Sequence, residues 1–158
     1  MLYKLLTYPQ LLVLNPEKVL QRRLGLLKFI HSLPLGRMAL KARYCAMPSK
    51  YLHTDVCDLD FPNPVGLAAG VDTDGKYARE LGSLGFGFVE IGSVTPDPQE
   101  RPKKGRQMVF LPKDKAFLSN GNLRNKGVIH AINQLSKRTP GVILAGNISK
   151  NPTSSKEE

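Results

Sequence analysis

Three short apolar segments, each closed by small residues, constrain the fold of this chain more than any other feature. They occupy residues 65–70 (VGLAAG), 86–91 (FGFVEI) and 142–148 (VILAGNI). Runs of this length and composition indicate buried strands, and helical patterns follow the first at 75–84 and precede the third at 123–137. This alternation predicts parallel β/α units, whose ligands bind at the loops after the strands.

Charge divides the 158-residue chain, whose formal net charge is +10, into two parts. Residues 1–53 are rich in leucine and contain nine basic side chains and one acidic side chain. The remainder of the chain contains fourteen basic and twelve acidic side chains. We therefore predict a basic front segment at 1–53, a nearly neutral body at 54–151 and a polar tail at 152–158. With 41% hydrophobic residues, the chain has enough apolar surface to fold.

The front segment has the periodicity of short amphipathic helices. Helices are expected within 2–13, at 16–32 and at 37–46, with Asn15 as the N-cap of the second and Pro16 at its first position. No stretch reaches the roughly 18 apolar residues of a membrane span, and no small-residue cleavage site typical of a signal peptide follows. A spanning helix and a secretory signal are therefore not predicted.

The pattern of the front segment alone leaves its role open. Leucine on one face and lysine or arginine on the other suits a helical hairpin packed on the body, which is the commoner arrangement, and also a helix lying on a membrane surface. Nucleic acid is a third candidate for a basic face, but no stacking aromatics are interleaved with the basic residues. Cys45 and Cys57 stand alone, so neither a disulfide framework nor a metal site is predicted.

Five motifs together carry a resemblance to a known family. They are LLVLNPEKV, NPVGLAAGVDTDG, LGFGFVEIGSVTPDPQ, LPKDKAF and GNISKN. In this order and at this spacing, they resemble the membrane-associated, quinone-reducing class of dihydroorotate dehydrogenases, and the resemblance covers nearly the whole chain to about Asn151. The resemblance implies an α/β fold with an N-terminal helical extension, followed by the first three β/α units of a TIM-type (β/α)8 barrel that is incomplete in this chain.

The resemblance also implies an activity. Members of the family use FMN to oxidise dihydroorotate to orotate in de novo pyrimidine biosynthesis, and pass the electrons to a membrane quinone that enters between the N-terminal helices. It implies peripheral membrane association through those helices, on the cytoplasmic side if the source is bacterial, and no nucleic-acid partner. The alternative is a non-catalytic remnant of that enzyme that binds a membrane surface or a partner.

The resemblance assigns site residues by position. Ala68, Ala69 and Gly70 are expected against the FMN ring, Ser93 as a further FMN contact, and Asn147 near flavin and substrate. Asn125 falls within the substrate loop. No catalytic residue is assigned, because the family's serine base is expected beyond Glu158.

Several positions depart from the family pattern, including Ser149 in place of a glycine and Pro152 in place of a lysine. Thr73 stands where the family usually has a lysine that reaches flavin and substrate, and the neighbouring Lys76 is expected to lie on the following helix. Ser119 occupies the first asparagine position of the substrate loop, and Leu20 stands where many members have a histidine near the quinone site. A neutral hydroxyl at position 73 does not supply the positive charge that favours an anionic carboxylate ligand.

Overall fold

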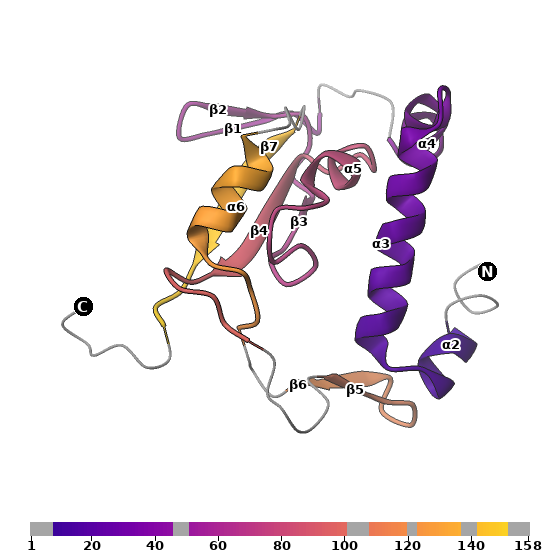
Figure 1. Cartoon of the computed structure of the whole chain (residues 1–158). Coiled ribbons are helices and arrows are strands. Elements are labelled where there is room, and N and C mark those ends of the chain that lie inside the picture. The colour runs from indigo at the N-terminus through magenta and orange to yellow at the C-terminus, as the bar shows by residue number, and fades with distance from the viewer. Residues whose placement is uncertain (1–7, 46–50, 101–107, 120–122, 137–141, 152–158) are drawn as a thin grey trace.

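The computed structural model combines a helical N-terminal segment with a small parallel sheet (Figure 1). It describes residues 8–45, 51–100, 108–119, 123–136 and 142–151. Two antiparallel hairpins accompany the sheet. The chain is therefore mixed α/β, as the sequence predicts.

Three helices form the front segment: α2 (Tyr8–Val13), α3 (Pro16–Ser32) and α4 (Gly36–Tyr44). The predicted N-cap is confirmed, because the Asn15 side chain accepts a hydrogen bond of 2.9 Å from the Glu17 backbone N–H. The helix expected at 37–46 begins one residue earlier, and its predicted end lies outside the described residues. Over the described part of the chain, no helix is both long and apolar enough to cross a membrane.

The parallel sheet has the strand order β3 (Gly66–Leu67), β4 (Phe88–Val94) and β7 (Ile143–Ile148). Leu67 lies opposite Val89, and Val89 lies opposite Leu144, so the central strand pairs in parallel on both sides. The three predicted strands are thus present, and their carboxyl ends meet at one edge of the sheet. The middle strand runs three residues further than predicted, through the expected loop to Val94.

The first strand and the helix after it, α5 (Ala78–Gly82), are shorter than the sequence predicts. The strand ends early because the Ala69 backbone N–H donates to the Glu90 carboxylate, 3.2 Å away, instead of to a neighbouring strand. The helix begins late because Gly75 has a φ of +69°, outside the helical region. Both departures leave irregular backbone between 68 and 77, at the carboxyl end of the strand.

In the last helix, α6 (Val128–Leu135), the buried face differs from the apolar face that the sequence predicts. Sequence periodicity places Val128, Ile129, Ile132 and Leu135 on the buried side, but Ile129 is 67% exposed and Ile132 is 55% exposed. Ala131 is the buried residue, and Leu135 packs beside it. The reason is that only the Ala131 side of α6 faces the sheet, so the wider apolar face is uncovered in the described structure.

Two hairpins flank the sheet. β1 (Thr54–Val56) and β2 (Leu59–Phe61) form a hairpin near the start of the body, and the Phe61 ring meets Phe88 edge to face with centroids 5.8 Å apart. β5 (Met108–Leu111) and β6 (Ala116–Ser119) form a second hairpin that the sequence analysis did not predict. Its Phe110 packs against Tyr8 of α2, which ties it to the front helices.

The main core joins the front helices to the sheet. Val89, a fully buried residue of β4, packs with Leu81 of α5, with Tyr77 just before that helix and with Leu24 of α3. Because side chains alternate along a strand, the residues on either side of Val89 point to the opposite face, which these helices do not cover. A second buried cluster lies between β4 and α6 and contains Ala78, Ile91, Val94 and Ala131.

Leu24→Ala tests this docking of the front segment. We expect it to lower the free energy of unfolding by about 2–5 kcal/mol, because it removes a buried side chain and leaves a cavity against Val89. Leu26→Ala is the matched control on the same helix, since Leu26 is 48% exposed, and it should cost far less. Urea unfolding of both variants measures the difference; equal losses would contradict a shared core.

Candidate functional site

A pocket of about 420 Å³ lies at the carboxyl ends of the three parallel strands. Its described lining comes from all three strand ends, from the β5–β6 hairpin and from the segment before α6: Ala68, Ala69, Gly70, Thr73, Glu90, Ser93, Met108, Ser119, Leu123, Arg124 and Asn147. All five residues that the resemblance assigned to the cofactor are therefore brought together in one place.

The Glu90 carboxylate organises the polar part of the pocket. One carboxylate oxygen accepts the Ala69 backbone N–H at 3.2 Å, and the other accepts the Asn147 side-chain N–H at 3.0 Å. The Asn147 oxygen in turn accepts a hydrogen bond from the Ser93 hydroxyl. A single acid thus fixes three of the predicted cofactor residues, one from each strand end.

Two glycines shape the pocket in different ways. Gly92 has a φ of +114°, and a Cβ on it would collide with the carbonyl oxygen of Asn147. Gly70 has a φ of +104°, but a Cβ there would meet nothing within 4 Å. The backbone at Gly70 therefore faces open space, bordered by Ala68 and by the polar groups of Ser93 and Asn147. A flat ring with polar edges fits this combination of open backbone and directed side chains.

Asn125 lies beside the pocket and does not line it in the described structure. Its side chain is buried, and its oxygen accepts the Gly127 backbone N–H at 2.8 Å. Its amide nitrogen donates to the Leu123 carbonyl at 2.7 Å and to the Thr95 hydroxyl at 2.9 Å. The hydrogen-bonding groups of Asn125 are thus directed at the protein itself.

Two of the departures from the family pattern also fall in the pocket. Thr73 and Ser119 both contribute to its lining. Lys76 does not line it, and its ammonium group lies over the ring of Tyr77, 5.1 Å from the centroid. The expectation that Lys76 lies on the following helix is wrong, because α5 begins at Ala78, but its side chain does stay outside the pocket lining.

The Asp72 carboxyl supports the loop that carries Ala68, Ala69 and Gly70. It is buried, and it accepts the backbone N–H groups of Lys76 at 2.9 Å and Tyr77 at 2.7 Å. Burial raises the pKa of Asp72 above its ordinary value, and the negative charges of Asp74 and Glu80 add to this, while the two backbone hydrogen bonds oppose it. Asp72 therefore has a structural role, which is to hold the backbone that follows Gly70.

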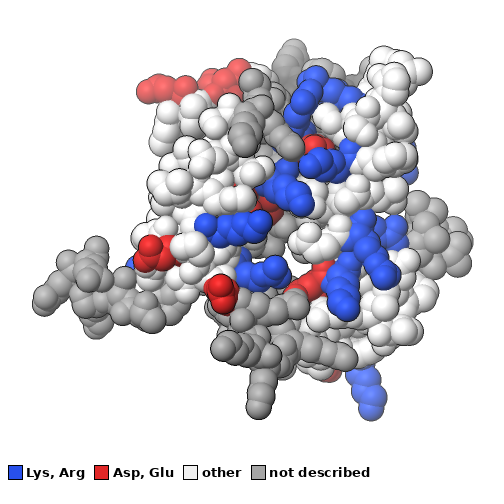
Figure 2. Space-filling model, in the orientation of Figure 1, with Lys and Arg blue, Asp and Glu red and all other residues white. Residues whose placement is uncertain are grey.

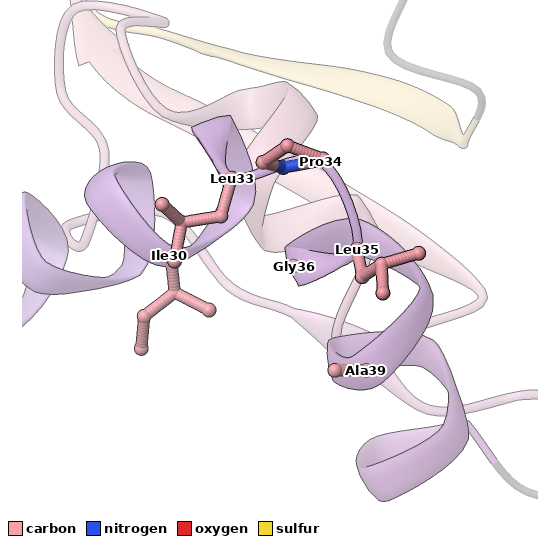
Figure 3. A pocket seen from close by; sticks show the side chains of 6 residues that line it. All are labelled: Ile30, Leu33, Pro34, Leu35, Gly36 and Ala39. Atoms are coloured by element: carbon pink, nitrogen blue, oxygen red, sulfur yellow. The ribbon is translucent and has the colours of Figure 1, made fainter.

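A second hollow, entirely separate from the first, lies where α3 turns into α4 (Figure 3). It measures about 510 Å³, is open to solvent, and is lined by apolar side chains and backbone: Ile30, Leu33, Pro34, Leu35, Gly36 and Ala39. Its lining offers almost no polar surface, so any ligand it holds would be apolar.

Sequence reasoning missed four residues that line the first pocket, of which Met108 and Leu123 are apolar and Glu90 and Arg124 are charged. Glu90 lies inside the quoted motif LGFGFVEIGSVTPDPQ, where an acid in an otherwise apolar strand is a signal of a polar role. Arg124 lies next to Asn125, which was assigned to the substrate instead. No pattern in the sequence distinguishes which of these two neighbours faces the pocket.

A parallel sheet with a polar pocket at its carboxyl ends is the arrangement typical of the β/α class of proteins, whose ligand sites lie at that edge of the sheet. The family model described as dihydroorotate dehydrogenase matches residues 51–157, and the chain belongs to that family. The resemblance seen in the sequence is thereby confirmed.

Named relatives and solved structures agree with this membership. The chain is 38% identical over 157 residues to a dihydroorotate dehydrogenase (quinone) of Christiangramia forsetii and 44% identical over 142 residues to one of Cellvibrio japonicus. The two matches include 99% and 89% of this chain, but only 45% and 39% of the respective relatives. The chain thus spans less than half the length of these curated relatives.

Among solved structures, the chain resembles a DHODH of Eimeria tenella in complex with ferulenol, with a TM-score of 0.69 and 26% identity. That match covers 94% of this chain and 40% of the other. A ligand-free DHODH from the same organism gives a TM-score of 0.62 and 30% identity, over 76% of this chain and 37% of the other.

Glu90→Gln tests the organising role of the carboxylate. Glutamine has the same shape but presents one acceptor and one donor to two N–H groups, so either Ala69 or Asn147 loses its partner. We expect the side-chain amide resonances of Asn147 to shift in a ¹H–¹⁵N NMR spectrum, with a loss of about 1–3 kcal/mol in the free energy of unfolding. Unmoved Asn147 resonances would show that Glu90 does not orient this amide.

Asp72→Asn tests the buried acid. Because the pKa of Asp72 is raised on folding, the folded state holds the proton more tightly than the unfolded state. The unfolding free energy of the wild type relative to the variant should therefore be highest at low pH, and should fall as the pH rises from the ordinary pKa through the raised one. Urea unfolding of both proteins across the acidic range measures this difference, and an increase with pH would contradict it.

Proposed function

We propose that this chain forms the flavin-binding part of a quinone-dependent dihydroorotate dehydrogenase, which oxidises dihydroorotate to orotate in pyrimidine biosynthesis. The observation that carries the proposal is the pocket in which Ala68–Gly70 expose their backbone beside the Glu90, Asn147 and Ser93 network. Membership of the family and the names of the relatives support it.

FMN, when bound, would accept the hydride that dihydroorotate loses. The small residues at 68–70 would let the ring lie against the backbone, and the Ser93 hydroxyl and Asn147 amide would direct hydrogen bonds at its edge. Glu90 would hold the Asn147 amide in one orientation. None of the described residues that line the pocket is proposed as the proton-abstracting base.

We also propose that the three-stranded parallel sheet is the beginning of a (β/α)8 barrel. The order β3-β4-β7, in which each strand pairs with the next along the sheet, is the order that the first strands of such a barrel have. The solvent-exposed Ile129 and Ile132 of α6 and Ile148 of β7 are then the surface on which further units would pack.

The front segment is proposed to bind the membrane surface and admit the quinone. Leu26 and Phe29 on α3, Met38 on α4 and Leu35 in the turn between them are exposed, at or near the apolar hollow of Figure 3. Figure 2 shows lysine and arginine side chains on α3 and across the middle of the same face, with fewer acids. Apolar side chains next to basic ones are the pattern of a helix that lies on an anionic bilayer.

A second candidate function is a non-catalytic protein that keeps only the surface or partner binding of that enzyme. Thr73 favours it, because the pocket lacks a cation at the position where the family usually has lysine. In this case the front helices would bind membranes while the pocket would bind no flavin.

Titration of the 158-residue chain with FMN separates the two candidates. Flavin fluorescence quenching and yellow colour retained on gel filtration are expected from a chain that binds FMN. Ala68→Leu should weaken binding at least about ten-fold, because Ala68 is exposed in the pocket and a larger side chain would occupy the space of the ring. Ala42→Leu on exposed α4 is the matched control and should bind FMN as the wild type does.

Co-sedimentation with vesicles of anionic lipid completes the test. Vesicle binding without FMN binding by folded protein would support the second candidate and contradict the first. FMN binding that Ala68→Leu leaves unchanged would mean that the flavin lies elsewhere.

A further inference from the structure

The two charged side chains that line the pocket differ in how many hydrogen bonds they make within the protein. Among the lining residues that the structure describes, Glu90 is the acid and Arg124 is the base. Both oxygens of Glu90 already accept hydrogen bonds, from Ala69 and Asn147. The Arg124 side chain is exposed, and within the described residues its guanidinium makes no hydrogen bond or ion pair. The pocket thus holds a positive charge with its donors available to a ligand.

The backbone on both sides of Arg124 is fixed. The buried side chain of Asn125 binds the Leu123 carbonyl before Arg124 and the Gly127 N–H after it. The Asn125 backbone also pairs with Gln99, with N–H to carbonyl distances of 2.8 and 3.3 Å. A side chain held at its base in this way loses less freedom when it binds, so its contacts contribute more affinity.

We propose that Arg124 is the anion-binding residue of this pocket and pairs with the carboxylate of a small planar ligand. The proposal rests on the proposed function, in which dihydroorotate and orotate each carry one carboxylate. A guanidinium presents two parallel N–H donors to the two oxygens of a carboxylate, which gives strength and direction. Arg124 therefore supplies, from another segment that lines the same pocket, the positive charge that Thr73 lacks.

Neighbouring cations do not share this role. Lys76 lies over the ring of Tyr77, outside the lining. Lys126 is exposed, does not line the pocket, and donates its backbone N–H to the Asp74 carboxylate at 2.8 Å. Lys126 is two residues from Arg124 and contributes the same charge to the chain, so Lys126→Gln is a control for general electrostatic attraction.

The test is calorimetric titration of the full chain with three separate probes: FMN, orotate and orotamide, in which an uncharged amide replaces the carboxylate. We expect the wild type to prefer orotate to orotamide. Arg124→Gln should weaken orotate binding about ten-fold or more while FMN and orotamide bind as before, which also shows that the variant is folded. Arg124→Lys should retain part of the orotate affinity, and Lys126→Gln should retain all of it.

Each other outcome has a distinct meaning. If Arg124→Gln binds orotate as tightly as the wild type, or Lys126→Gln loses as much, the role of Arg124 is overturned and the proposed function stands. If the wild type binds FMN without preferring orotate to orotamide, the inference is overturned and the flavin site stands. If the wild type binds neither FMN nor orotate, the inference and the proposed function fall together.

Discussion

The carboxylate of Glu90 is the interaction on which the pocket depends. Its two oxygens hold the Ala69 backbone and the Asn147 amide, and Asn147 accepts from Ser93, so one acid links the ends of three strands that are far apart in sequence. The position of Glu90 follows from the alternation of β4: Val89 points into the helical core, and its neighbour therefore points to the other face. One face of β4 thus packs in the hydrophobic core, and the opposite face supplies the acid of the pocket.

Much of the site follows from the sequence. Small residues after a buried strand predict an exposed backbone, and Ala68–Gly70 line the pocket together with Ser93 and Asn147. The arrangement of the predicted substrate loop around Asn125 could not be predicted from the sequence in the same way. Asn125 and Arg124 are adjacent and both polar, and which of them is buried depends on Thr95 and Gly127, whose hydrogen bonds to Asn125 form only in the folded chain.

In the fold as well, some features are determined by neighbouring residues and others by residues that are distant in the sequence. The start of α3 is encoded by neighbouring residues, since Asn15 caps the helix through the N–H of Glu17. The length of β3 is not, because it depends on Glu90, more than twenty positions away. Periodicity along α6 identifies an apolar face, but it does not reveal that the sheet covers only the side around Ala131. The β5–β6 hairpin is stabilised by Phe110 against Tyr8, a pairing across the chain that no local pattern contains.

The uncovered faces of the sheet and of α6 have a kinetic consequence. In the described structure β3 and β7 are the outer strands, and Ile129, Ile132 and Ile148 are exposed on the last helix and strand. Outer strands present unpaired backbone groups, which template the addition of another strand. Folding of this chain is a first-order process, whereas pairing between two copies is second order. For the 158-residue chain on its own, the balance between the single copy and paired copies therefore depends on concentration as well as on stability, and dilute solution favours the single copy.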